Sequence, residues 1–145
     1  MMSEVAMTDK QAPVPDRYSA FYWENAARGR LAVQACEECG QVQFPPNAVC
    51  ESCQSQSLTA RPVSGRATLY AMTVIRQAFH PAWKDSLPYV IAQVQLDDAP
   101  GIRIQTNIVQ ADPADLKAGD PLEVVYEQRG DVTVPQFRPT QKNGT

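Results

Sequence analysis

Four cysteines form two Cys-x-x-Cys pairs, and the chain of 145 residues has no other cysteine. The first pair is Cys36 and Cys39, the second is Cys50 and Cys53, and ten residues separate the pairs. Two such pairs can place four thiolates around one tetrahedral Zn²⁺. The alternatives are two disulfides, which are typical of exported proteins, and a redox motif, which would not need a second copy. We therefore expect one structural zinc ion with no open coordination position for chemistry.

Apart from the cysteines, the sequence offers few residues that could take part in catalysis. Its only histidine is His80, in a predicted loop that also holds Phe79, Trp83 and Lys84. A lone loop histidine is usually solvated or hydrogen-bonded, and no nucleophile elbow, Walker loop or dinucleotide signature occurs. We therefore predict no catalytic residue. The loop and the nearby Arg76 present apolar bulk beside cations, which suits an acyl thioester with a phosphorylated head or a partner protein. The alternative is a loop folded back over the mouth of a barrel.

Composition indicates a globular protein, with 43% hydrophobic and 20% charged residues and a net charge of −3. Residues 1–10 have neither the basic region nor the apolar core of a signal peptide. No apolar run approaches the roughly twenty residues that span a bilayer. We expect a cytoplasmic protein that does not enter a membrane, in agreement with reduced, metal-bound cysteines.

The N-terminal part should consist of a flexible tail (1–15) followed by a helix and a zinc ribbon (16–63). The helix is predicted over 16–30, with Asp16 or Ser19 as its cap and Gly29 at its end. Its centre, Phe21-Tyr22-Trp23, covers about 200° of the helix surface, more than one apolar stripe needs. Either the helix lies between two parts of this protein, or part of it docks onto another chain.

The ribbon should contain strands at 31–35 and 58–63 and a compact hairpin at 41–44. A unit this small has almost no core of its own, so metal binding would supply most of its folding free energy.

A barrel is predicted over 64–139, followed by a short tail (140–145). Runs typical of strands, separated by turn residues, indicate five strands, and the third alternates cleanly between apolar and polar residues. Asp112-Pro113 begins a short helix between the third and the fourth. The strands are expected at 67–75, 89–96, 102–108, 122–127 and 132–137. This order is that of the OB fold. The expected fold is therefore mainly β: an N-terminal helix, a rubredoxin-like zinc ribbon and a five-stranded OB barrel.

A zinc ribbon joined to an OB barrel first suggests nucleic-acid binding, which depends on Lys and Arg that neutralise phosphates. Residues 35–60 contain no Lys or Arg, and residues 66–138 hold seven basic residues against nine acidic ones. This charge balance argues against a nucleic-acid partner.

Several stretches, taken together and in order, resemble a known family, the zinc-ribbon/OB-fold proteins associated with acyl-CoA enzymes. The resemblance covers about residues 17–139. The stretches are Phe21-Tyr22-Trp23, Gly29-Arg30-Leu31, Cys36-Glu37-Glu38-Cys39-Gly40, Phe44-Pro45-Pro46, Cys50-Glu51-Ser52-Cys53, Ser64-Gly65-Arg66-Ala67-Thr68-Leu69-Tyr70, Leu87-Pro88-Tyr89-Val90 and Pro135-Gln136-Phe137.

This resemblance implies a non-catalytic subunit that forms a hetero-oligomer with a thiolase-fold protein (a thiolase, a retro-aldolase or an acyltransferase). Such a subunit assists assembly, and acyl-CoA would bind or pass at the shared interface. Our alternatives are a stand-alone acyl-CoA or lipid-binding module and, less favoured, a nucleic-acid-binding OB protein. The residues that we expect to contact acyl-CoA or the partner are Phe21, Tyr22, Trp23, Arg76, Phe79, His80, Trp83, Lys84 and Arg103.

Overall fold

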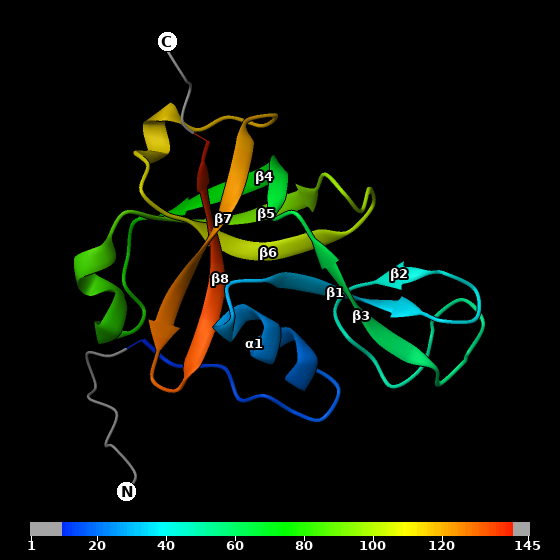
Figure 1. The fold of residues 1–145 in the computed structure, drawn as a ribbon. Helices are drawn as coiled ribbons and strands as arrows, with labels where there is room; N and C mark the ends of the chain where they lie inside the picture. The colour runs from blue at the N-terminus through cyan, green and yellow to red at the C-terminus, as the bar shows by residue number, and fades with distance from the viewer. Residues whose placement is uncertain (1–9, 141–145) are drawn as a thin grey trace, which may run out of the picture.

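The computed structural model describes residues 10–140, so most of the two predicted tails lies outside the described part. A small three-stranded ribbon extends from one side of a barrel, and the helix lies beside the junction (Figure 1). The elements are α1 (Ala20–Ala27), β1 (Leu31–Cys36), β2 (Val42–Gln43), β3 (Leu58–Val63), β4 (Arg66–Ile75), the 3₁₀-helix η1 (Pro81–Ser86), β5 (Tyr89–Leu96), β6 (Arg103–Ile108), the 3₁₀-helix η2 (Pro113–Asp115), β7 (Pro121–Arg129) and β8 (Val132–Pro139). Within residues 10–140, no helix has the length and apolar character needed to cross a membrane.

The barrel is closed, and its strands follow the order β4-β5-β6-β8-β7, with β7 returning to pair with β4. The one parallel contact joins β6 and β8, at Ile108 and Phe137. The short helix η2 lies between the third and fourth strands, and the Asp112 side chain accepts a hydrogen bond from the backbone of Ala114. The structure confirms the predicted OB fold. Every second residue of β5, namely Val90, Ala92, Val94 and Leu96, lies in the core.

The helix is shorter than predicted, covering Ala20–Ala27 instead of 16–30. At its start, the carboxylate of Asp16 accepts hydrogen bonds from the backbone of Tyr18 and Ser19, at 2.9 and 2.8 Å, and so holds a separate turn. At its end, Gly29 has φ +73°, and the N–H groups of Gly29 and Arg30 bond to carbonyls of the last turn. This is the Schellman arrangement for which glycine is suited, so the predicted end at Gly29 is confirmed.

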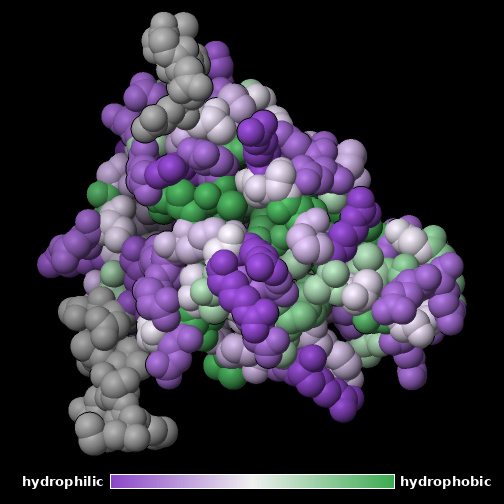
Figure 2. Space-filling model, in the orientation of Figure 1, coloured by the Kyte–Doolittle hydropathy of each residue, from purple (hydrophilic) through white to green (hydrophobic). Residues whose placement is uncertain are grey.

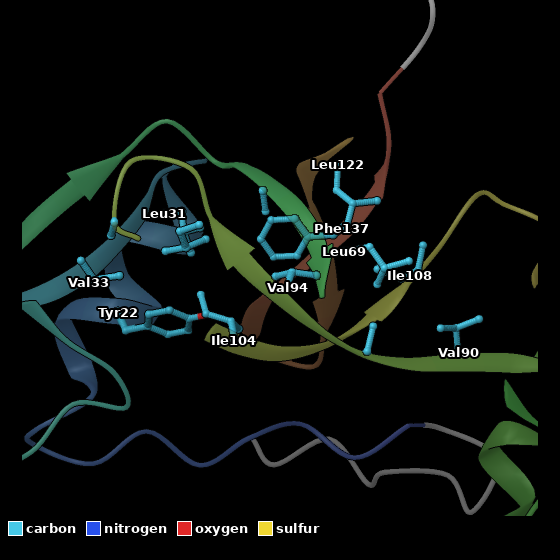
Figure 3. Close-up of a cluster of buried hydrophobic side chains, with 14 residues drawn as sticks. Tyr22, Leu31, Val33, Leu69, Val90, Val94, Ile104, Ile108, Leu122 and Phe137 are labelled. Atoms are coloured by element: carbon cyan, nitrogen blue, oxygen red, sulfur yellow. The ribbon is translucent and has the colours of Figure 1, made fainter. Parts of the chain in front are cut away.

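The hydrophobic core runs without a break from the ribbon into the barrel (Figure 3). Tyr22 of α1 and Leu31 and Val33 of β1 belong to the same buried cluster as Leu69 and Phe137 of the barrel. The helix contacts both β1 and β8. Of the two readings of the aromatic helix, the structure therefore favours a helix held between two parts of this protein.

Gly65 joins the last ribbon strand to the first barrel strand. Its φ is +87°, and its carbonyl accepts a hydrogen bond from the Val124 backbone at 2.9 Å. A Cβ atom at this position would overlap the side chain of Val124. Beside it, the amide and hydroxyl of Ser64 donate to the carboxylate of Asp98 at 2.8 and 2.6 Å. The direction in which the ribbon leaves the barrel therefore depends on a residue without a side chain.

We predict that Gly65→Ala lowers the free energy of unfolding by about 2–5 kcal/mol. The left-handed backbone costs an L-residue roughly 1–2 kcal/mol, and the overlap with Val124 adds about 1–3 kcal/mol. Gly119→Ala is the matched control, because Gly119 has φ +96° and no heavy atom lies within 4 Å of its would-be Cβ. Urea unfolding of both variants measures the difference. Equal losses in the two variants would contradict the role of the Val124 contact.

Candidate functional site

The sulfur atoms of Cys36, Cys39, Cys50 and Cys53 lie within 4.8 Å of one another. Cys36 and Cys53 are 3.7 Å apart at sulfur, and Cys39 and Cys50 are 3.6 Å apart. Zinc–sulfur bonds of about 2.3 Å in a tetrahedron place neighbouring sulfurs about 3.8 Å apart. All four cysteines are free thiols. The four residues therefore form a metal-binding cluster, and their spacing fits a closed tetrathiolate site.

The two cysteine pairs sit on turns of the same construction. In each turn the N–H of the first cysteine, Cys36 or Cys50, donates to the carbonyl five residues later at 2.8 Å. The carbonyl of that cysteine accepts from the N–H four residues later, at 3.0 Å in the first turn and 2.8 Å in the second. Both turns need one residue with positive φ, and this residue is Gly40 (77°) or Gln54 (62°). The repeated backbone geometry aims both sulfurs of each pair at one point.

The electrostatics of the cluster favour a bound cation. The backbone N–H of Cys39 donates to the sulfur of Cys36 and lowers the pKa of the Cys36 thiol to about 6. For Cys53, a backbone hydrogen bond from Ser55 favours the thiolate, but desolvation and the neighbouring thiols outweigh it and raise the pKa to about 12. Deprotonation of Cys36 is thus favoured, whereas deprotonation of Cys53 is disfavoured. A divalent cation removes this opposition by neutralising the shared charge.

Two buried glutamines, which the sequence analysis did not single out, hold the segment between the cysteine pairs. Gln34 and Gln43 are 4% and 2% exposed. The amide of Gln43 donates to the Gln34 side chain at 2.7 Å, and that of Gln34 donates to the Asn47 carbonyl at 2.9 Å. The side-chain oxygen of Gln43 accepts from the backbone N–H of Glu51 at 2.9 Å. These bonds position the second cysteine pair against β1 and β2.

We predict that Gln43→Leu destabilises the ribbon by about 2 kcal/mol or more. The substitution keeps the side-chain size but leaves several buried partners unpaired, each at a cost of about 1–3 kcal/mol. The variant should also release its metal to a chromophoric chelator faster than the wild type. Gln41→Leu, at an exposed position two residues earlier, should change neither quantity. If the two variants behave alike, the glutamine network does not support the metal site.

The predicted aromatic contacts on the helix lie mostly inside the molecule. Tyr22 is 6% exposed, and its ring centroid lies 4.8 Å from that of Trp23 and 5.4 Å from that of Phe44. Burial raises the pKa of the Tyr22 hydroxyl. Phe21 and Trp23 are partly buried against the same core. These rings fill the junction of helix, ribbon and barrel, and a contact between them and a partner stays a prediction.

The predicted loop around His80 is in part a 3₁₀-helix, η1, which the sequence analysis missed. The Nδ1 atom of His80 accepts a hydrogen bond from the backbone of Ala82 at 3.0 Å and so caps this helix. Trp83 stacks on Tyr89 with 4.5 Å between ring centroids. In contrast, Phe79 is 82% exposed. One side of the loop folds back onto the barrel through Trp83. The other side, with Phe79, faces outward and is free to contact a ligand or a partner.

The predicted cationic contacts do not form one cluster. Arg76 and Lys84 are exposed near η1, whereas the guanidinium of Arg103 stacks on Tyr70, 3.8 Å from its ring centroid. Only the four cysteines among the predicted site residues converge on one point.

Three adjoining hollows, which the sequence analysis also missed, run along β5, β6 and β8. Their volumes are about 380, 330 and 220 Å³, and Asn107 of β6 lines all three. The second and third strands of an OB barrel and the loops beside them are the face on which such barrels bind ligands. Trp83 of η1 lines two of the hollows, and Arg129, at the end of β7, lines the one of about 380 Å³.

Comparison with known proteins agrees with this architecture. The family model described as the rubredoxin-like zinc ribbon domain of ChsH2 matches residues 23–59, and that of the C-terminal OB-fold domain of ChsH2 matches residues 60–127. A DUF35 domain-containing scaffold protein of Methanothermobacter thermautotrophicus is 30% identical over 88% of this chain and 85% of its own length. This chain belongs to the DUF35 family of zinc-ribbon/OB-fold proteins.

Other relatives are parts of larger proteins or assemblies. A probable enoyl-CoA hydratase alpha subunit of Thermomonospora curvata is 33% identical over 88% of this chain, but the match covers only 39% of that protein. A chain of the solved Ltp2-ChsH2(DUF35) aldolase is 31% identical, with a TM-score of 0.79 over 88% of this chain and 98% of that one. A DUF35 protein of Sulfolobus solfataricus, at 12% identity and a TM-score of 0.60, shows the same fold.

Proposed function

We propose that this chain is a non-catalytic subunit of a thiolase-like acyl-CoA enzyme complex. One observation carries the proposal: the chain matches, over almost its whole length, a component of the solved Ltp2-ChsH2(DUF35) aldolase. Relatives described as scaffold proteins support the same reading. The enzyme subunit would be a thiolase-fold protein, and this chain would help to assemble it and to bind or channel its acyl-CoA. Cytoplasmic CoA metabolism is the setting that we propose.

The second part of the proposal is that one Zn²⁺ occupies the cysteine cluster. Four thiolates at tetrahedral spacing suit zinc or iron, and the match to a zinc ribbon domain favours zinc. With Cys36, Cys39, Cys50 and Cys53 as ligands, the metal would have no open position, so it would supply folding free energy and no chemistry.

Purified protein should therefore contain about one zinc per chain by elemental analysis. Cys50→Ser should lose most of this zinc, because Cys50 is fully buried and its replacement removes one of four ligands. Ser52→Ala, within the same turn but at an exposed position, should keep it. Acidification should release zinc from the wild type, since protons compete with the metal for thiolates. Full zinc retention by Cys50→Ser, or iron in place of zinc, would contradict this assignment.

The partner contact is proposed to centre on Phe79. Its 82% exposure is unusual for a large apolar side chain, and cations at Arg76 and Lys84 lie nearby in sequence. Exposed aromatic residues at interfaces often act as binding hot spots. Hydrophobic surface also gathers over the region of β4–β6, surrounded by hydrophilic residues (Figure 2). Arg76 and Lys84 would meet the phosphates of acyl-CoA at the shared interface, and Phe79 would line its apolar path.

We predict that Phe79→Ala weakens assembly with a co-expressed thiolase-fold protein encoded nearby by about thirtyfold. Loss of a hot-spot side chain costs about 2 kcal/mol or more, and about 1.4 kcal/mol is a factor of ten. Val14→Ala is the control, because Val14 is 90% exposed on the segment that precedes the helix. Calorimetric titration of the two purified subunits measures both variants. If Phe79→Ala binds like the wild type, the interface lies elsewhere.

As a second candidate function, the chain would be a stand-alone module that binds acyl-CoA or a lipid. The hollows along β5, β6 and β8 favour this alternative. Affinity purification separates the two: a subunit brings a thiolase-fold protein with it, whereas a carrier retains acyl-CoA alone.

A further inference from the structure

One of the three hollows, of about 380 Å³, lies where the helix, the ribbon and the barrel meet. We call it the junction hollow. Its apolar wall includes Trp23 of α1 and Phe44 and Pro46 of the ribbon. Its polar wall includes Asn107, Gln136 and Arg129 of the barrel. The lining of the hollow is therefore mixed, and Arg129 is the one cation in it among the residues that the structure describes.

Arg129 is an unusual residue for this position. Its side chain is only 12% exposed, and its Nε donates to the carboxylate of Glu127 at 2.8 Å. Its Nη2 is buried and has no hydrogen-bond acceptor among residues 10–140. An unmet buried donor costs about 1–3 kcal/mol, and more when the group is charged. An acceptor that reached this nitrogen after a small turn of the guanidinium would remove that cost.

The charges around Arg129 restrict the acceptor. Glu127 already pairs with the guanidinium. The guanidinium carbon of Arg129 lies 5.5 Å from the ring centroid of Trp83, and the ammonium of Lys10 lies 4.4 Å from the same centroid. Two cations and one carboxylate give a local net charge of +1. The net positive charge favours an anion over a cation such as an ammonium ion. A planar carboxylate can accept from the remaining guanidinium N–H groups, and we take it as the simplest such anion.

We propose that the junction hollow binds a monocarboxylic acid with a compact apolar body. The carboxylate accepts from Arg129, and the body rests on Trp23 and Phe44. The hollow holds about a dozen water volumes of roughly 30 Å³ each, which matches an aryl acid of about eleven non-hydrogen atoms. This site belongs to the chain by itself, so it goes beyond the proposed partner function and does not depend on it.

The test is a titration of the isolated, metal-loaded full chain with phenylpropionate, followed by calorimetry and by tryptophan fluorescence, to which Trp23 and Trp83 both contribute. We expect saturable binding of one molecule per chain. Phenylpropanol, which has the same body without the charge, should bind at least tenfold more weakly. Phenylpropionate should bind Arg129→Gln at least tenfold more weakly than the wild type.

Arg138→Gln is the matched control. Arg138 also pairs with a glutamate of β7, Glu123, at 3.0 Å, but it does not line the junction hollow. This variant should bind phenylpropionate like the wild type. The proposal is overturned if phenylpropionate shows no saturable binding at millimolar concentration, if the alcohol binds as well as the acid, or if Arg138→Gln has the same effect as Arg129→Gln. The comparison of acid and alcohol needs only the wild type, so it decides the matter even if Arg129→Gln fails to fold.

Discussion

The ribbon rests on the core of the barrel, because Leu31 and Val33 of β1 are buried with the barrel's own side chains. The three short ribbon strands cannot bury enough apolar surface to fold alone. One end of the ribbon is instead fixed by this shared core, and the other end by the cysteine cluster. Tyr22 closes the junction from the helix side. The orientation of the metal site relative to the barrel follows from these two anchors.

Several groups in residues 10–140 that could be reactive instead hold the structure together. The four thiols converge on one metal position. The imidazole of His80 caps η1 through its Nδ1 atom. The carboxylate of Glu127 is paired with Arg129, and that of Asp98 holds the Ser64 turn, which lowers its pKa. The features that could bind a ligand or a partner are the exposed Phe79 and the hollows along β5, β6 and β8. Such a chain is suited to binding, which agrees with the proposed accessory role.

Elements with strong local patterns were predictable from the sequence. The strands expected at 58–63 and 89–96 have those bounds in the structure, and the two cysteine pairs predicted a converging cluster. The helix was predicted too long because the carboxylate of Asp16 closes its own turn before Ser19. Helix η1 was missed because it is short and its mixed polarity gives it no period.

Features that depend on tertiary contacts left no signal in the sequence. Gln34 and Gln43 look like ordinary exposed strand residues, and only the packing of the ribbon reveals that they are buried and bonded to each other. Arg129 likewise looks like a turn cation at the end of β7. Its burial, and its place beside the ribbon and the helix, arise from segments far apart in the chain.

The proposed accessory role means that this chain supports acyl-CoA turnover by a thiolase-fold partner and does not turn over acyl-CoA by itself. The most direct measurement is acyl-CoA turnover by three samples: this chain, the neighbouring thiolase-fold protein, and the co-purified complex. We expect no turnover by this chain, weak or no turnover by the partner, and full turnover by the complex. Turnover by this chain alone, or a partner equally active without it, would contradict the accessory role.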